Sequence, residues 1–210
     1  KIREAHSVLV ITCKDEAVKM TVGKKSKHFA GMSDSDIASE LSSKYNLQSD
    51  IESSAFVCKQ ALQYWISDWD FMVQRANRMG KLCTVDNGKI IIKAPDLNGS
   101  PALDVLHCAT MRDYDAEIDA REQWKSLKGK TWDPSGQAVT ESQAGEPAWQ
   151  QAGDLNATDL AGMANNGEEE LIIATGNFAS DEIQHYAEAR LMFQRLSKIR
   201  GSVSFQGYPQ

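Results

Sequence analysis

The dipeptide Asn87-Gly88 is the sequence feature that most restricts how this chain can fold. It separates two short runs rich in β-branched residues, 82–86 and 89–93. Both residues tolerate the positive φ angles of a two-residue type I′ turn, so a β-hairpin is predicted here. Pro95 follows the second run and ends the hairpin, because proline cannot donate a hydrogen bond to a central ladder.

Two helices are predicted before this hairpin. Ser33 and Asp36 have the spacing of a capping box, and an apolar stripe follows them, so we expect a helix over 34–45. A wider apolar face at helical spacing predicts a second helix over 58–79, which ends at Gly80. The residues of this second face are Leu62, Trp65, Ile66, Trp69, Met72, Val73, Ala76 and Met79.

Strand patterns occur at the start and in the middle of the chain. The apolar run 7–13 is typical of a buried strand, and the alternation over 17–22 is typical of a half-buried one. Residues 115–120 alternate acidic with apolar side chains, whereas residues 124–132 alternate basic with apolar ones. We expect these two oppositely charged segments to pair as neighbouring strands.

The last third of the chain is predicted to combine loops, helices and short strands. Glycine, proline and polar residues mark a loop, and Ser180 with two acids after it marks a helix start. The expected elements are a loop over 141–156, a short helix over 158–164, a strand over 171–175, a helix from Ser180 that ends before Gly201, and a strand over 202–206.

Composition excludes several classes of function. The 210 residues include 23 Lys and Arg against 29 Asp and Glu, a net charge of −6 without any basic block, so we do not expect a nucleic-acid partner. The longest apolar runs are far shorter than the roughly 20 residues of a membrane span, so we expect no membrane anchor. No apolar core of a signal peptide follows the basic start. Because the chain begins at Lys1 rather than Met, we expect a domain-sized part of a longer protein.

The four cysteines, Cys13, Cys58, Cys83 and Cys108, do not form a CxxC pair, and their spacing does not support a zinc site. Each lies among apolar residues. We therefore expect four buried free thiols, in keeping with synthesis in a reducing cytoplasm.

Three groups of carboxylates are candidates for chemistry. Asp68 and Asp70 could act as a catalytic pair, but residues two apart on a helix point to different faces, so one is expected to be a solvated charge. Asp113, Asp115, Glu117 and Asp119 line one side of a predicted strand, where either a cation site or a charged sheet face is conceivable, and the charged face is preferred. Glu168, Glu169 and Glu170 are expected to form a solvated turn.

Histidines and aromatic residues allow two further hypotheses. His28 and His107, the latter beside Cys108, could form a cysteine–histidine nucleophile, but partly buried strand positions are expected instead. His6 and His185 are isolated in the sequence. Tyr64, Trp65 and Trp69 could stack on a sugar or a base, although helical spacing among apolar residues favours the core.

A longer pattern links these pieces. Ser33-Asp34-Ser35-Asp36-Ile37 opens the first predicted helix, Ser67-Asp68-Trp69-Asp70-Phe71 precedes Gly80 in the second, and the hairpin follows. In this order and spacing, residues 29–95 resemble the VgrG and late control protein D family of tail hub proteins. Residues 115–121, 130–134 and 187–207 resemble the second half of the same family, and the nearest type is the Rhs-element Vgr protein.

This resemblance implies an α+β fold made of fragments of antiparallel β-barrel tube domains with an inserted α/β subdomain of two to four helices and a hairpin. It also implies boundaries along the chain. The expected parts are residues 1–30 as the end of a first barrel domain, 31–100 as the α/β insertion, 101–145 as strands of a second barrel-like domain, 146–200 as a helical insertion and 201–210 as a truncated return strand.

The function implied by the resemblance is structural. Such a chain is a hub or tip component of a contractile injection machine, either a type VI secretion system or a phage tail baseplate. Its expected partners are two further copies in a homotrimer, the tail tube protein, a spike or tip protein, and effectors. We expect cytoplasmic synthesis and assembly, followed by export within the particle without a signal peptide.

The family role requires no enzyme chemistry, so no catalytic, cofactor-binding or metal-binding residues are expected. Two alternatives remain open. One is a cell-wall hydrolase that uses the acidic residues named above, and the other is a carbohydrate-binding module that uses the aromatic ones.

Overall fold

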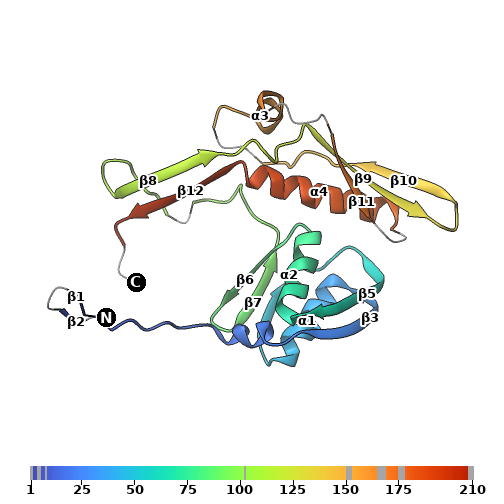
Figure 1. Cartoon of the computed structure of the whole chain (residues 1–210), viewed down its shortest axis with the longest axis horizontal. Coiled ribbons are helices and arrows are strands. Elements are labelled where there is room, and N and C mark those ends of the chain that lie inside the picture. The colour runs from blue at the N-terminus through green and yellow to red at the C-terminus, as the bar shows by residue number, and fades with distance from the viewer. Residues whose placement is uncertain are drawn as a thin grey trace. The chain divides into compact units, whose positions relative to one another are not determined.

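A computed structural model describes residues 2–3, 6–7, 9–101, 103–149, 153–164, 169–174 and 178–207 (Figure 1). The chain divides into two compact units, residues 1–76 with 82–93 and residues 77–81 with 94–210. Each unit combines helices with small sheets, which confirms the predicted α+β class. No closed barrel is present among the described residues.

Among its described residues, the first unit contains two two-stranded sheets, β1–β2 and β3–β5, one three-stranded sheet, two α-helices and a 3-10 helix. Strands β3 and β5 pair antiparallel, while β7 pairs antiparallel with β6 and parallel with β4. The elements are β1 Ile2–Arg3, β2 His6–Ser7, the 3-10 helix η1 Glu16–Thr21, β3 Lys25–Ser33, α1 Asp34–Lys44, β4 Gln48–Ile51, β5 Val57–Ile66, α2 Asp68–Arg78, β6 Leu82–Asp86 and β7 Lys89–Lys93.

One apolar core joins these elements. Phe29 of β3 stacks on Phe71 of α2, with ring centroids 5.7 Å apart. The apolar side chains of both helices and of the central strand β7 complete the core, as expected for amphipathic elements that cover a sheet. Its most deeply buried large side chains are Met20, Phe29, Ile37, Leu41, Met72, Ile90 and Ile92.

The predicted hairpin is confirmed. Asn87 and Gly88 have φ angles of 47° and 75°, and β6 pairs with β7 on either side of them. The Gly88 N–H also donates to Oδ2 of Asp15 at 2.8 Å, which ties the turn to the start of η1. Glycine suits this position because its φ is positive.

The capping box that opens α1 is confirmed as well. Ser33 Oγ accepts from the Asp36 N–H at 3.1 Å, and Asp36 Oδ2 accepts from the Ser33 N–H at 3.2 Å. Helix α2 begins in a related way, because Ser67 Oγ accepts from the Asp70 N–H at 3.0 Å. Both helices therefore start with a Ser-Asp-x-Asp sequence whose second residue, Asp34 or Asp68, is buried.

Asp68 accepts hydrogen bonds from four side chains of the first unit. Burial by itself would raise the pKa of this carboxyl, but its hydrogen bonds hold the pKa well below the ordinary value of 3.8. The donors are Gln63 Nε2 at 2.7 Å, Lys25 Nζ at 2.7 Å, Tyr45 Oη at 2.6 Å and Lys44 Nζ at 2.9 Å. Its charge is thus stabilised by groups from β3, from β5, and from the end of α1 and the residue after it.

Asp34 has a smaller set of partners. Arg75 of α2 donates from Nε to Asp34 Oδ1 at 2.5 Å, and its Nη2 lies 2.7 Å from the Cys58 sulfur. The start of α1 is therefore bonded to α2, while the start of α2 is bonded to the end of α1. This reciprocal arrangement fixes the two helices against each other.

Three predictions for the first half are wrong. Residues 58–66 do not continue α2 but form strand β5, because Ser67 caps the helix and the helix starts at Asp68. Residues 16–21 form the helix η1 rather than a strand, since Asp15 Oδ1 accepts from the Ala17 N–H at 2.9 Å and caps it. Within the predicted buried strand 7–13, residues 9–13 are in no strand, and Leu9 is 84% exposed.

The second unit contains a three-stranded sheet, a separate pair of strands and two helices. In the sheet, β9 pairs antiparallel with β10 and parallel with β11, while β8 pairs antiparallel with β12. The elements are β8 Met111–Ile118, β9 Ser126–Asp133, β10 Ala138–Gln143, α3 Ala157–Met163, β11 Glu169–Ala174, α4 Ser180–Leu196 and β12 Ile199–Phe205.

Helix α4 covers the three-stranded sheet, as Figure 1 shows. Leu127 of β9 packs with Ala187 and Leu191 of the helix in a small core. Gly129 of β9 lets the helix approach closely, because a Cβ there would lie 2.8 Å from Ile183 Cγ1 and 3.1 Å from the Ile183 carbonyl oxygen. The absence of a side chain at Gly129 therefore sets the distance between sheet and helix.

Several predictions for the second half need correction. The two oppositely charged segments do not pair, since residues 111–118 pair with β12 and residues 126–133 pair with β10 and β11. The predicted helix from Ser180 corresponds to α4, which begins at Ser180 with Ala179 as its N-cap. It ends at Leu196, earlier than predicted. Gly201 lies inside β12, opposite Ala116, and does not end the helix.

The remaining predictions for the second half concern short elements. The predicted helix 158–164 corresponds to α3, and the strand over 202–206 to β12. The predicted strand 171–175 corresponds to β11, apart from residue 175, which lies outside the described residues. The first residues of the predicted loop 141–156 belong to β10, which extends to Gln143.

Replacing Asp68 by asparagine tests the role of this carboxylate. The Asp68→Asn variant is expected to lose about 2–3 kcal/mol of unfolding free energy. This loss is smaller than the loss expected for a fully buried ion pair, because the Lys25 and Lys44 side chains are 34% and 47% exposed and can be hydrated. Urea denaturation measures the change. Asp70→Asn, at an exposed position of the same turn, is the matched control and should cost less than about 1 kcal/mol.

The comparison of wild type with Asp68→Asn also gives a pH test. Since the pKa of Asp68 is lower in the folded than in the unfolded state, its stabilising contribution is complete above about pH 5 and is lost as the pH falls towards the folded pKa. The difference in unfolding free energy between wild type and Asp68→Asn should shrink by about 1 kcal/mol between pH 5 and pH 3. A difference that stays constant over this range would contradict the assignment.

A second substitution tests the contact between α4 and its sheet. Gly129→Ala should lower the unfolding free energy by about 1–3 kcal/mol, because the new methyl group would overlap Ile183 of α4. Gly162→Ala in α3 is the control, since no atom lies within 4 Å of its added Cβ and alanine favours a helix. Equal melting temperatures for the two variants would refute this account of the packing.

Candidate functional site

The strand pair β8–β12, which we call the ribbon, is separate from the three-stranded sheet of the second unit. The two strands are in register from Ile118 opposite Ile199 to Met111 opposite Phe205, with one bulge. Gly201 permits close pairing, because a Cβ there would lie 2.3 Å from the Asp115 carbonyl oxygen. Within the described residues, neither strand pairs with any other, so each leaves one edge open.

The two faces of the ribbon differ in chemistry. Opposed residues of an antiparallel pair share a face, so Tyr114 lies beside Val203 and Ile118 beside Ile199 on one side. These four apolar side chains are exposed, Tyr114 by 62% and Val203 by 45%. An exposed apolar face on an open strand pair is typical of a surface that another chain or segment covers.

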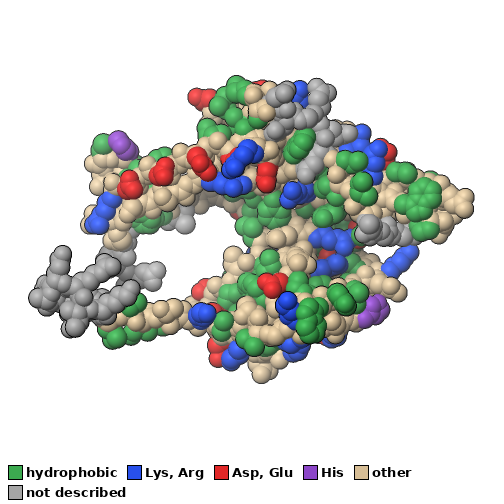
Figure 2. All heavy atoms as spheres, viewed as in Figure 1, with side chains coloured by type: hydrophobic (Ala, Val, Ile, Leu, Met, Phe, Trp, Pro, Cys, Tyr) green, Lys and Arg blue, Asp and Glu red, His purple; other side chains and the backbone are tan. Residues whose placement is uncertain are grey.

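The opposite face of the ribbon is acidic. Asp113, Asp115 and Glu117 alternate along β8 opposite Ser204, Ser202 and Arg200, and Figure 2 shows a row of acidic side chains along the ribbon. The four predicted carboxylates do not form one site, because Asp119 lies after the strand and accepts from Arg121 Nε at 2.9 Å. Among the described residues, no group of three potential metal ligands occurs.

The predicted catalytic pair is not assembled. Asp68 is completely buried and surrounded by its four donors, while Asp70 is exposed on the same turn, as expected of residues two apart. The hydrolase hypothesis therefore loses Asp68 as an acid or base accessible to a substrate. Glu168 lies outside the described residues, and Glu169 and Glu170 begin β11 instead of forming a turn.

Histidines and cysteines are more exposed than expected. His28 lies exposed on β3, and His107 lies exposed in a turn, where Nδ1 is 3.1 Å from the Cys108 sulfur. Cys58 is buried, and burial of Cys83 raises the pKa of its thiol to about 11, but Cys13 and Cys108 are exposed. All four thiols are free, as predicted. His6 belongs to β2, where only the backbone is described.

The aromatic residues separate into two environments. Trp69 packs against the core of the first unit, as predicted, whereas Tyr64 and Trp65 are 77% and 66% exposed on β5. Trp65 has a φ of 48° next to a bulge and donates its backbone N–H to Ser26 Oγ at 3.1 Å. The carbohydrate-binding hypothesis thus keeps two of its three aromatic residues.

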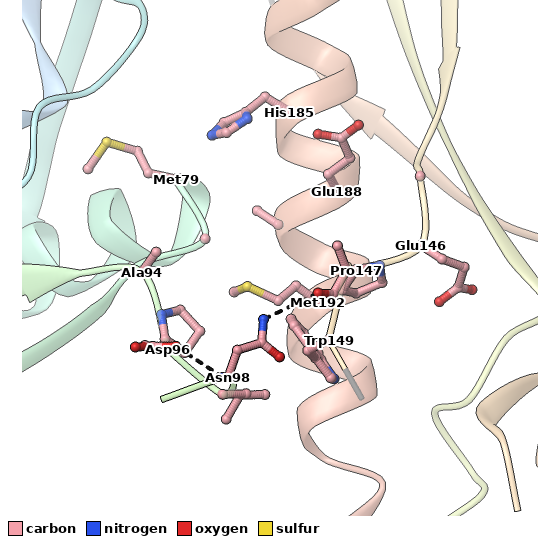
Figure 3. Close-up of a pocket in the computed structure, with 16 residues that line it drawn as sticks. Met79, Ala94, Asp96, Asn98, Glu146, Pro147, Trp149, His185, Glu188 and Met192 are labelled. Atoms are coloured by element: carbon pink, nitrogen blue, oxygen red, sulfur yellow. Dashed lines mark hydrogen bonds between the residues drawn. The ribbon is translucent and has the colours of Figure 1, made fainter. Parts of the chain in front are cut away.

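A pocket of about 450 Å³ lies in the second unit (Figure 3). It is bounded by α4, by residues 94–98, by residues 145–149 and by the turn after α2 at 79–80. The Asn98 side chain donates from Nδ2 to the Ala148 carbonyl oxygen at 3.4 Å and thereby connects the two loops. Sequence reasoning missed this pocket, because its walls come from four separate segments and only Pro95 and Pro147 marked two of them as loops.

No helix within the described part of the chain is both long and apolar enough to span a membrane.

Comparisons with known proteins give the fold a context. No curated protein matches the sequence. The structure is similar to the 43 kDa tail protein of prophage MuSo2 from Shewanella oneidensis, with a TM-score of 0.64 and 9% identity over 92% of this chain and 56% of that one. It is also similar to the tail protein from Neisseria meningitidis MC58, with a TM-score of 0.60 and 11% identity over 91% of this chain and 57% of that one.

A third similar structure is prophage tail protein gp18 from Listeria monocytogenes EGD-e, with a TM-score of 0.52 and 9% identity over 90% of this chain and 56% of that one. The chain thus spans somewhat more than half of the length of these tail proteins. At such low identity the similarity concerns the fold, which this chain shares with these tail proteins. The model of one sequence family, the Alg8 N-terminal domain, matches residues 1–210, and the chain therefore belongs to the Alg8 N-terminal domain family.

Proposed function

We propose that this chain is part of a hub or tip component of a contractile injection machine, in which three copies form an adaptor between a tail tube and a spike. The observation that carries this proposal is the fold, which three tail proteins, two of them from prophages, share over 90–92% of this chain. The VgrG-like order of the two Ser-Asp-x-Asp helix starts and the hairpin supports the same role.

The ribbon supports assembly into a ring. A pair of strands that is isolated in water is marginally stable, and it gains stability when further strands or another surface cover its apolar face. The exposed Tyr114, Ile118 and Val203 therefore favour a state in which a neighbouring subunit covers this face. The open edges of β8 and β12 offer unpaired backbone groups to the same neighbour.

The segment around Leu9, Val10 and Ile11 offers a second surface of this kind. All three side chains are more than two-thirds exposed, with values of 84%, 73% and 72%, and β-branched residues at this density favour strand pairing. In the proposed assembly the segment adds a strand to a sheet of a neighbouring subunit, because backbone pairing and side-chain burial would then both be satisfied.

The remaining partners follow from the proposed role. A tail tube protein binds one side of the ring, a spike or tip protein binds the other, and effectors travel with the particle. The chain acts without enzymatic chemistry and is assembled in the cytoplasm before export within the particle. These parts of the proposal rest on the resemblance to tail hubs and on the shared fold.

The oligomeric state of the full-length protein tests the proposal. Native mass spectrometry and light scattering are expected to give the mass of a homotrimer. A charge on the apolar face of the ribbon, as in Val203→Asp, should weaken association at least tenfold, because it would place an unpaired carboxylate in the contact.

Ser204→Asp is the matched control, since it places the same charge on the acidic face of the same strand. It should retain the trimer, and circular dichroism should show that both variants are folded. A full-length protein that stays monomeric and does not co-sediment with tail tube or spike proteins would overturn the proposal.

A further inference from the structure

The pocket of the second unit has walls of a particular composition. Met79 and Met192 contribute thioether side chains, and Trp149 contributes an indole beside Met192, as Figure 3 shows. Gly80 lies close to α4, because a Cβ there would be 3.3 Å from the Ala189 Cβ and 3.5 Å from the Met192 Cε. Flexible methionines and an aromatic ring form an adaptable apolar surface for a guest side chain.

Apart from His185, the titratable side chains that line this pocket are acidic. Asp96, Glu146 and Glu188 line it, and neither lysine nor arginine does. Glu146 is neutralised, because Arg195 donates from Nε and Nη2 to its carboxylate at 3.0 and 2.5 Å, and Figure 3 shows its side chain directed away from Met192 and Trp149.

The other two carboxylates accept from neutral donors only, within the described part of the chain. Asp96 accepts from the Asn98 N–H at 3.0 Å, and Glu188 accepts from Gln184 Nε2 at 3.0 Å. Each keeps lone pairs for a further donor. The pocket thus combines apolar walls with two carboxylates that accept no hydrogen bond from a lysine or arginine among the described residues.

We propose that this pocket binds an arginine or lysine side chain, with its apolar neighbours, from a protein partner of the assembled particle. The inference rests on the proposed function for the nature of the partner. A guanidinium group can stack on the Trp149 ring, and its methylene groups can lie along Met79 and Met192. Asp96 and Glu188 then supply charge-assisted hydrogen bonds to the guest. The volume lies in the range usual for ligand pockets.

Peptide binding to the full-length protein tests this assignment. The probe is acetyl-Leu-Arg-Leu-Arg-Leu-amide carrying a fluorophore, measured by fluorescence polarisation against the same peptide with glutamine in place of arginine. We expect the arginine peptide to bind at least tenfold more tightly at low salt, and the advantage to decrease as salt is raised.

Variants of the pocket locate the binding. Glu188→Gln and Asp96→Asn should each lower the affinity for the arginine peptide about threefold to fivefold, as expected for the loss of one partly exposed ion pair. Trp149→Ala should lower the affinity for both peptides. Asp113→Asn removes an equal charge from the ribbon of the same unit and should leave binding unchanged. Circular dichroism confirms that each variant is folded.

Each outcome decides one statement. Equal affinity for the arginine and glutamine peptides, or affinity that Glu188→Gln and Asp96→Asn leave unchanged, would overturn the inference. Measuring the mass of the same samples distinguishes a failure of this inference from a failure of the proposed function. A trimer that does not bind the peptide refutes the inference alone, and a monomer that binds it through the pocket refutes the ring alone.

Discussion

The first unit depends on the buried carboxylate of Asp68. A charged group without solvent is tolerated only where its partners are fixed, and four donors from β3, β5 and the end of α1 meet at this one side chain. In the opposite direction, Asp34 at the start of α1 accepts a hydrogen bond from Arg75 of α2. Because each helix start is bonded to the other helix, the two helices, the β3–β5 pair and their shared core form one cooperative structure.

In the second unit, two glycines allow neighbouring elements to approach each other closely. Gly129 and Gly201 leave space where α4 meets β9 and where β12 meets β8. The three-stranded sheet is covered by α4, but the ribbon keeps its apolar face in solvent. This unequal covering is the physical basis of the proposed assembly, since exposed apolar side chains and open strand edges are stabilised by a neighbour.

The pocket adds a second kind of surface to the same unit. Methionine and tryptophan side chains give it affinity for apolar groups, while Asp96 and Glu188 restrict the guest to a cation. The carboxylates that looked suited to catalysis have other places in the structure, because Asp68 stabilises the fold and Asp113, Asp115 and Glu117 line a solvated face.

The sequence by itself determined the local elements whose signals lie within a few residues. The hairpin at Asn87-Gly88, the capping box at Ser33 and the short helix α3 needed only turn and capping chemistry. The tertiary structure decided what distant residues share. The pairing of β8 with β12, the partners of Asp68 and the pocket join segments far apart in the chain, and the assignment of residues 58–66 to a strand depended on the partner β3. An apolar run fits a helix or a strand until packing selects one, because its side chains are buried equally well in either.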